Sequence, residues 1–136
     1  MRRLAATGAI VIAAALSGCG FNVQSPDLFL LTRTGQGTKL TLLVNYGGTL
    51  RCNGGKSRQM TDSMLITARD LSDNLADDGT KNLTIPATPR TIFYYRIKVQ
   101  QGAISFPDAS ARTHSELAQA ELFAAQAAQQ VCHLSG

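Results

Sequence analysis

The feature that most constrains the fold of this 136-residue chain is a change in the spacing of its apolar residues. From Ile92 to Val99, apolar or aromatic side chains alternate with Tyr94, Arg96 and Lys98. A period of two is typical of a β-strand with one buried face. From Thr61 or Asp62 to Leu75, apolar residues instead recur at helical spacing. The chain is therefore expected to fold into separate strands and helices.

Three strands are expected before this first helix. They are separated by glycine-containing turns, which suit hairpins because glycine readily adopts a positive φ. In the second strand, Leu40, Leu42 and Val44 share one face, and in the third we place Leu50 and Cys52 in the core. An antiparallel meander follows, with strands at 28–34, 39–45 and 49–52.

The second half of the chain repeats the change from strand to helix. We expect a polar loop at 53–58, a first helix that ends before Gly79, and a loop at 79–91. Strands at 92–99 and 103–106 come next, and Thr113 and Glu116 predict a capping box at the start of a final helix. The apolar stripe of this helix is Leu117, Ala120, Phe123 or Ala124, Ala127 and Val131. The predicted fold is α+β: a four- or five-stranded antiparallel sheet with two helices on one face, in the order β-β-β-α-β-β-α.

The first eighteen residues have the parts of a secretory signal. Two arginines, Arg2 and Arg3, precede an uncharged and mostly apolar run from Leu4 to Leu16. This run is shorter than the roughly 20 residues that a membrane-spanning helix needs. We therefore divide the chain into a signal at 1–18, a lipidated N-terminus and tether at 19–27, and a single α+β domain at 28–136.

The residues Leu16-Ser17-Gly18-Cys19 resemble the lipobox of bacterial lipoproteins. The resemblance implies cleavage between Gly18 and Cys19, a diacylglycerol group on the Cys19 sulfur, and an N-acyl chain. Two or more acyl chains give a stable anchor, so the expected partner is a lipid bilayer and the expected location is the extracytoplasmic face of a cell membrane. The chain is also similar in composition to small uncharacterised actinobacterial lipoproteins. A plain signal peptide followed by a chance cysteine is the alternative.

The two other cysteines, Cys52 and Cys132, form an even pair in an oxidising compartment, which predicts a disulfide. The bridge would close a loop of about 80 residues, for which the chain-entropy relation gives roughly 4.5 kcal/mol. A metal site or a redox pair is the alternative. Removal of Arg2 and Arg3 lowers the net charge from +4 to +2. So small a surplus gives no reason to expect a nucleic-acid partner.

Two groups of residues are candidates for a binding surface. Arg51, Lys56 and Arg58 are expected to give the loop after Cys52 a positive rim, which could contact anionic head groups or an acidic envelope polymer. Tyr94, Arg96 and Lys98 line the outer face of their strand, a combination that suits an envelope protein as partner. Ordinary solvated surface is the alternative for both groups, and the oligomeric state is left open.

No catalytic residue, metal ligand or cofactor is predicted, apart from the acyl chains on Cys19. His114 and His133 flank the last helix, and neither position suggests a general base. A catalytic triad assembled in space stays the alternative. The Gly-Lys-Ser run that ends at Ser57 resembles the end of a phosphate loop, but Leu50 stands where that motif needs glycine. Asp73, Asp77 and Asp78 lack the ligand spacing of a calcium loop.

Thr49-Leu50-Arg51-Cys52, followed by Gly54-Gly55, is similar to part of the subtilisin-inhibitor family, which places two helices on a five-stranded sheet. That family has two disulfides and this chain has cysteines for one, so no reactive-site residue is transferred. The first hypothesis is a non-enzymatic envelope binding module. The second is a protease inhibitor with bait at 54–59 or 79–90, and the third is a small hydrolase.

Overall fold

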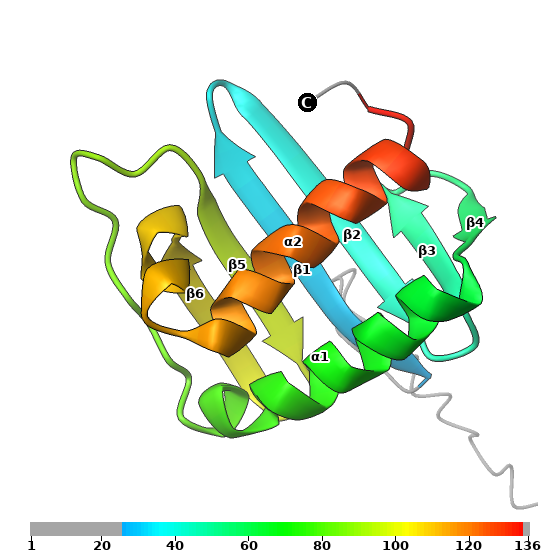
Figure 1. Ribbon diagram of the computed structural model, residues 1–136, viewed down its shortest axis with the longest axis horizontal. Helices are drawn as coiled ribbons and strands as arrows, with labels where there is room; N and C mark the ends of the chain where they lie inside the picture. The colour runs from blue at the N-terminus through cyan, green and yellow to red at the C-terminus, as the bar shows by residue number, and fades with distance from the viewer. Residues whose placement is uncertain (1–25, 135–136) are drawn as a thin grey trace, which may run out of the picture.

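The computed structural model describes residues 26–134, which form one six-stranded antiparallel sheet and two long helices (Figure 1). The spatial order of the strands is β4-β3-β2-β1-β5-β6. The elements are β1 (Asp27–Gly35), β2 (Thr38–Asn45), β3 (Thr49–Cys52), β4 (Ser57–Gln59), α1 (Asp62–Thr80), β5 (Tyr94–Val99), β6 (Gly102–Pro107), a 3₁₀ helix η1 (Asp108–Arg112) and α2 (Ser115–Gln130). The predicted α+β class is confirmed. No helix within this part of the chain is both long and apolar enough to span a bilayer.

The number of strands differs from the prediction because the expected polar loop at 53–58 contains β4. Its residues Ser57, Arg58 and Gln59 are all exposed, so no apolar alternation marks this strand in the sequence. Pairing with β3 alone defines it, for example Leu50 with Arg58. The observed order is therefore β-β-β-β-α-β-β-α, with six strands instead of four or five.

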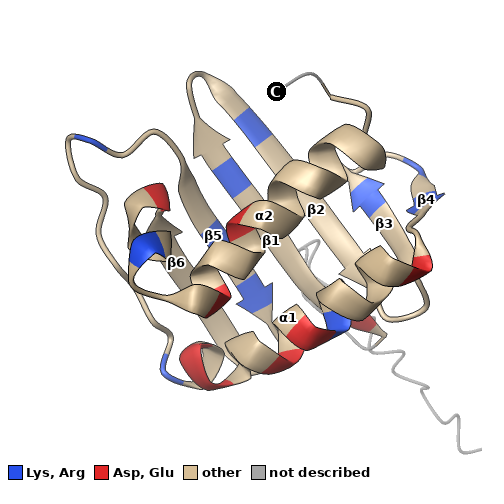
Figure 2. Ribbon diagram, viewed as in Figure 1, with Lys and Arg blue, Asp and Glu red and all other residues tan. Residues whose placement is uncertain are grey.

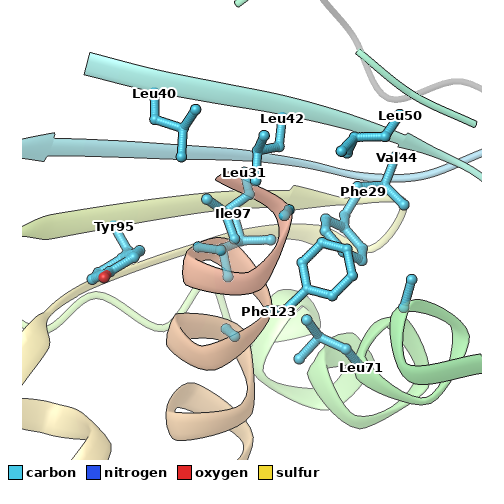
Figure 3. Packing of buried hydrophobic residues seen from close by; sticks show 14 of the residues in the cluster. Phe29, Leu31, Leu40, Leu42, Val44, Leu50, Leu71, Tyr95, Ile97 and Phe123 are labelled. Atoms are coloured by element: carbon cyan, nitrogen blue, oxygen red, sulfur yellow. The ribbon is translucent and has the colours of Figure 1, made fainter. Parts of the chain in front are cut away.

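Both helices cover the same face of the sheet, as predicted (Figure 1). Alternate residues of the central strands point into the layer between sheet and helices, where Phe29, Leu31 and Ile97 are fully buried. Phe123 of α2 packs edge-on against Phe29, with ring centroids 5.6 Å apart (Figure 3). This contact fixes α2 over the centre of the sheet, since aromatic pairs favour such edge-to-face geometry.

Helix α1 begins where the sequence indicated and ends later. Thr61 is its N-cap, because its Oγ1 accepts the Met64 N–H at 3.2 Å. Gly79 was expected to end the helix, and that prediction is wrong. Gly79 is buried within α1, and a Cβ atom there would lie 2.5 Å from Cγ2 of Val99. The glycine therefore serves close packing of α1 on the sheet, not chain reversal.

The capping box predicted at the start of α2 is not formed. His114 is the N-cap residue and makes no side-chain capping bond. Thr113 instead follows η1, and its hydroxyl donates to the Ser110 carbonyl at 3.3 Å. The 3₁₀ turn shifts the helix start by one residue, which removes the spacing that a capping box needs.

The disulfide between Cys52 and Cys132 is present, with Cα atoms 5.8 Å apart. It joins the end of β3 to the residues just after α2, so it holds the last helix against the sheet as predicted.

At the opposite edge of the sheet, the segment 83–85 runs along β6. The Ile85 N–H donates to the Ser105 carbonyl at 2.8 Å, and the Ser105 N–H donates to the Leu83 carbonyl at 2.9 Å. Part of the loop predicted at 79–91 is thus hydrogen-bonded to the edge of the sheet.

Candidate functional site

The side chains that point away from the helices form the second face of the sheet, which we call the open face. Within residues 26–134, α1 and α2 both lie on the other side. Strand register places four residues in one row across this face: Arg51 opposite Leu43, Leu43 opposite Leu30, and Leu30 opposite Lys98. The row therefore has a cation at each end and two leucines between them.

The open face contains a hollow of about 740 Å³. Ten residues line it: Leu30, Thr32, Lys39, Thr41, Leu43, Arg51, Asn53, Gly54, Arg96 and Lys98. Its floor is neutral, since the leucines and threonines come from the two central strands. Its cations come mainly from the flanking strands β3 and β5. Concave sites of this size, with an apolar floor and a few polar groups, are typical of ligand-binding surfaces.

Charge is divided between the two layers of the molecule. Of the nine acidic residues in the chain, five lie in α1, one in η1 and two in α2. Figure 2 shows these acidic residues gathered on the helical elements. The hollow is lined by four cations, and no carboxylate is found among the lining residues of the described chain. Such a field attracts anions and repels cations.

The two arginines of the hollow are held toward opposite edges of the sheet. Arg51 donates from Nε to Ser57 Oγ on β4 at 3.2 Å. Arg96 donates from Nη1 to Ser105 Oγ on β6 at 3.3 Å. Each serine belongs to the strand beyond the one that carries its arginine. The two guanidinium groups therefore stay apart instead of converging over the centre of the hollow.

Three of the six predicted binding residues, Arg51, Arg96 and Lys98, come together in this hollow. Tyr94 is on β5 with Arg96 and Lys98. Its hydroxyl donates to the Ile85 carbonyl at 2.9 Å, so it holds the segment 83–85 that runs along β6. Lys56 is exposed beside β4 and does not line the hollow.

Arg58, the third residue of the predicted positive rim, does not line the hollow. Its Nη1 donates to the Val131 carbonyl near the end of α2 at 3.4 Å, so the side chain lies on the helix side. The sequence prediction also missed Lys39, which lines the hollow. Its signal was available, because Lys39 alternates with Leu40 in a strand whose buried face was identified.

A second depression, of about 400 Å³, lies between the helices and is lined by Asn74, Ser115, Glu116 and Gln119. Burial, followed by the hydrogen bond and the negative charge of the Glu116 carboxyl, raises the pKa of Asp78. His114 adjoins this depression in sequence, but its Nδ1 lies 3.0 Å from Thr113 Oγ1 and 3.3 Å from the Ser110 carbonyl oxygen. Its ring is therefore occupied in holding the turn before α2.

Glu121, which was not singled out from the sequence, has the most strongly shifted carboxyl group. Burial, together with the negative charge of Asp108, raises the pKa of Glu121 to about 7. Its Oε1 is buried and has no hydrogen-bond partner within the described chain. Burial raises the pKa of Tyr95, and the negative charge of Glu121 raises it further. Glu121 lies on the side of the sheet opposite to the hollow.

Clusters that could hold a metal ion are not found in residues 26–134, where no group of three or more histidine, cysteine, aspartate or glutamate residues comes together. No family model, curated protein or solved structure matches this chain. The resemblances carried by the lipobox and by residues 49–55 therefore stay predictions. The signal and Cys19 themselves lie outside the described residues.

Proposed function

We propose that this chain is a cell-envelope lipoprotein, anchored to the bilayer through acylated Cys19, whose domain is a non-enzymatic binding module for an anionic ligand. One observation carries the ligand class: among residues 26–134, the hollow of the open face is lined by four cations and by no carboxylate. Arginine and lysine together bind phosphate and carboxylate groups through charge-assisted hydrogen bonds. The anchor rests on the lipobox, and an extracytoplasmic site agrees with the disulfide.

The anchor is tested by metabolic labelling of cells with a clickable palmitate analogue. The full chain should carry the label and partition into the membrane fraction, whereas a Cys19→Ala variant should lose both properties. A labelled Cys19→Ala chain would contradict lipidation at this residue.

The binding face is tested in intact cells with a photo-crosslinking amino acid. Placed at Thr41, within the hollow, it should join the lipoprotein to a ligand; placed at Thr67 on α1, it should not. The adduct at Thr41 should disappear when Arg51 and Arg96 are both changed to glutamine. Equal adducts from both positions, or an adduct that survives the arginine changes, would contradict binding at the open face.

A protease inhibitor is the second candidate, because one loop suits a bait segment. Residues 86–90 are exposed, and this stretch projects from the sheet (Figure 1). Thr88 and Thr91 brace the loop, since the Thr88 N–H donates to Thr91 Oγ1 at 2.8 Å. Inhibition of a serine protease that Arg90→Ala abolishes would favour this candidate. A panel of serine proteases that the purified lipoprotein does not slow would remove it.

A further inference from the structure

We propose that the open face binds a linear polyanion, which lies across the strands from β3 to β5 and places separate anionic groups on Arg51 and on Arg96 with Lys98. This inference rests on the proposed binding function and specifies the ligand of the same hollow. The polymer is defined by its chemistry: anionic groups repeated along a chain, joined by neutral segments. Four observations support an extended ligand over a single small anion.

The first observation is the separation of the cations. Strands β3 and β5 are separated by three steps in the sheet, through β2 and β1. With neighbouring strands about 4.8 Å apart, Arg51 and Lys98 are anchored roughly 14 Å from each other. Within β5, Arg96 and Lys98 are two residues apart on the same face, which gives a spacing of about 7 Å. One end of the ligand thus meets one cation and the other end meets two.

The second observation is the direction in which the arginines are held. Ser57 and Ser105 lie on the outer strands β4 and β6, so each hydrogen bond ties its guanidinium group to its own side of the sheet. Each guanidinium group has further N–H groups for a ligand at its own side. The two serines therefore keep two anion positions apart before any ligand arrives.

The third observation is the neutral floor between these positions. Leu30 and Leu43 lie in line between Arg51 and Lys98, and Thr32 and Thr41 lie beside them. The uncharged segment of a polymer can rest on the leucines, and its polar atoms can bond to the threonine hydroxyls. A cation pair at the centre would have suited a compact dianion instead.

The fourth observation is the shape of the surface. The open face is hollowed and not convex, so a flat bilayer would contact its edges and miss the leucine floor. A flexible chain can follow the hollow. The acidic residues on α1 and α2 repel a polyanion from the helical side of the domain (Figure 2). This repulsion favours its approach to the open face.

The test uses the acylated full-length lipoprotein in neutral detergent micelles and measures binding of inorganic phosphate chains. The probes are orthophosphate, tripolyphosphate, which is too short to span the two sides, and long-chain polyphosphate. At equal phosphate concentration, the long chain should bind at least about tenfold more tightly than tripolyphosphate, because two sites on one ligand raise the effective concentration. Affinity should fall with added salt as counterions are released.

Two variants test the geometry directly. Arg51→Ala should weaken binding of the long chain about tenfold and abolish its advantage over tripolyphosphate. Arg96→Ala leaves Lys98 at its side of the hollow, so it should weaken the long chain less and reduce that advantage without abolishing it. The matched controls are Arg90→Ala and Arg112→Ala, which remove the same charge from exposed residues outside the hollow. Both controls should bind like the unchanged protein, and circular dichroism should show that all four variants are folded.

Three results would overturn the inference. The first is equal affinity for tripolyphosphate and the long chain, which would indicate a single-anion site. The second is an equal loss in Arg51→Ala and Arg90→Ala, which would indicate attraction by net charge. The third is phosphatidylglycerol vesicles that compete as well as the long chain, compared with phosphatidylcholine vesicles, which would indicate a bilayer surface. Each of these leaves anion binding intact. Absence of binding to every anionic probe would overturn the proposed function as well.

Discussion

Glu121 shows how one buried carboxyl group can make the stability of the domain depend on pH. Its pKa in the folded chain is about 7, compared with an ordinary value of 4.5, because burial and Asp108 disfavour the charged form. The folded chain therefore keeps a proton that the unfolded chain loses as pH rises. Stability should fall between about pH 4.5 and pH 7, because the folded state binds more protons across that window.

A Glu121→Gln substitution should remove this dependence. The variant should be more stable than the unchanged protein at pH 8 by about 1 kcal/mol, a value well below the full pKa conversion because the side chain is partly in water. At pH 4 the two proteins should differ little. Urea denaturation at both pH values measures the effect, with Asp70→Asn on the exposed side of α1 as control. An equal change in both variants would contradict a specific role for Glu121.

At the scale of elements, the contact between α1 and the β5–β6 hairpin depends on two glycines. Gly79 of α1 faces Val99, and a Cβ atom on Gly102 would lie 2.1 Å from the Gly79 carbonyl oxygen. Real Cβ atoms do not approach other atoms so closely. The helix can lie at this distance from the hairpin only because both residues lack a side chain.

Gly79→Ala is expected to destabilise the domain by about 1–3 kcal/mol through overpacking. Helix propensity alone predicts the opposite sign, since alanine is favoured over glycine by about 1 kcal/mol within a helix. Thermal or urea denaturation measures the difference. In a Val99→Ala background the cost should shrink, because the clashing methyl group is gone. A stabilised Gly79→Ala variant would show that the helix can move away freely.

The disulfide connects the other end of the helical layer to the sheet. Replacement of Cys52 and Cys132 together by alanine should lower the free energy of unfolding by about 4 kcal/mol, because the unfolded chain gains the freedom of an 80-residue loop. Urea denaturation with and without a reductant tests this expectation. Reductant should destabilise the unchanged protein and leave the double variant unaffected. Equal stability of the two proteins without reductant would contradict it.

At the scale of the whole molecule, the cations that we propose bind an anionic ligand should reduce the stability of the domain when no ligand is bound. Lys39, Arg51, Arg96 and Lys98 line one hollow, and like charges on one face repel each other. Functional surfaces commonly reduce stability in this way.

A Lys39→Gln and Lys98→Gln double variant should therefore be more stable at low salt by a few tenths of a kcal/mol. The gain should disappear at about 1 M salt, where the screening length is near 3 Å. Arg90→Gln with Arg112→Gln, both outside the hollow, should show no such gain. Thermal denaturation across a salt series measures both pairs. A gain that persists at high salt would point to a cause other than charge repulsion.

Local pattern was enough to predict most of the elements. Alternation in 39–45 and 92–99 identified β2 and β5 and their buried faces, because the side-chain period of a strand depends only on the strand itself. The apolar run that begins at Leu28 identified β1 as a strand but did not indicate which of its faces is buried. The stripes of α1 and α2 followed from helical spacing in the same way. The number of cysteines predicted the disulfide, because only Cys52 and Cys132 remain once Cys19 is expected to carry lipid.

Pairing between distant segments decided the rest. The strand β4 exists because it lies beside β3, and Gly79 continues α1 because Val99 and Gly102 leave room for nothing larger. The candidate site likewise depends on how strands β3, β2, β1 and β5 pair with one another. The sequence alone identified Arg51, Arg96 and Lys98 as exposed cations, but the first two are 45 positions apart in the chain. Only the packing of β1 and β2 between β3 and β5 brings them to the two sides of one hollow, because strand order is fixed by the whole core and not by any single segment.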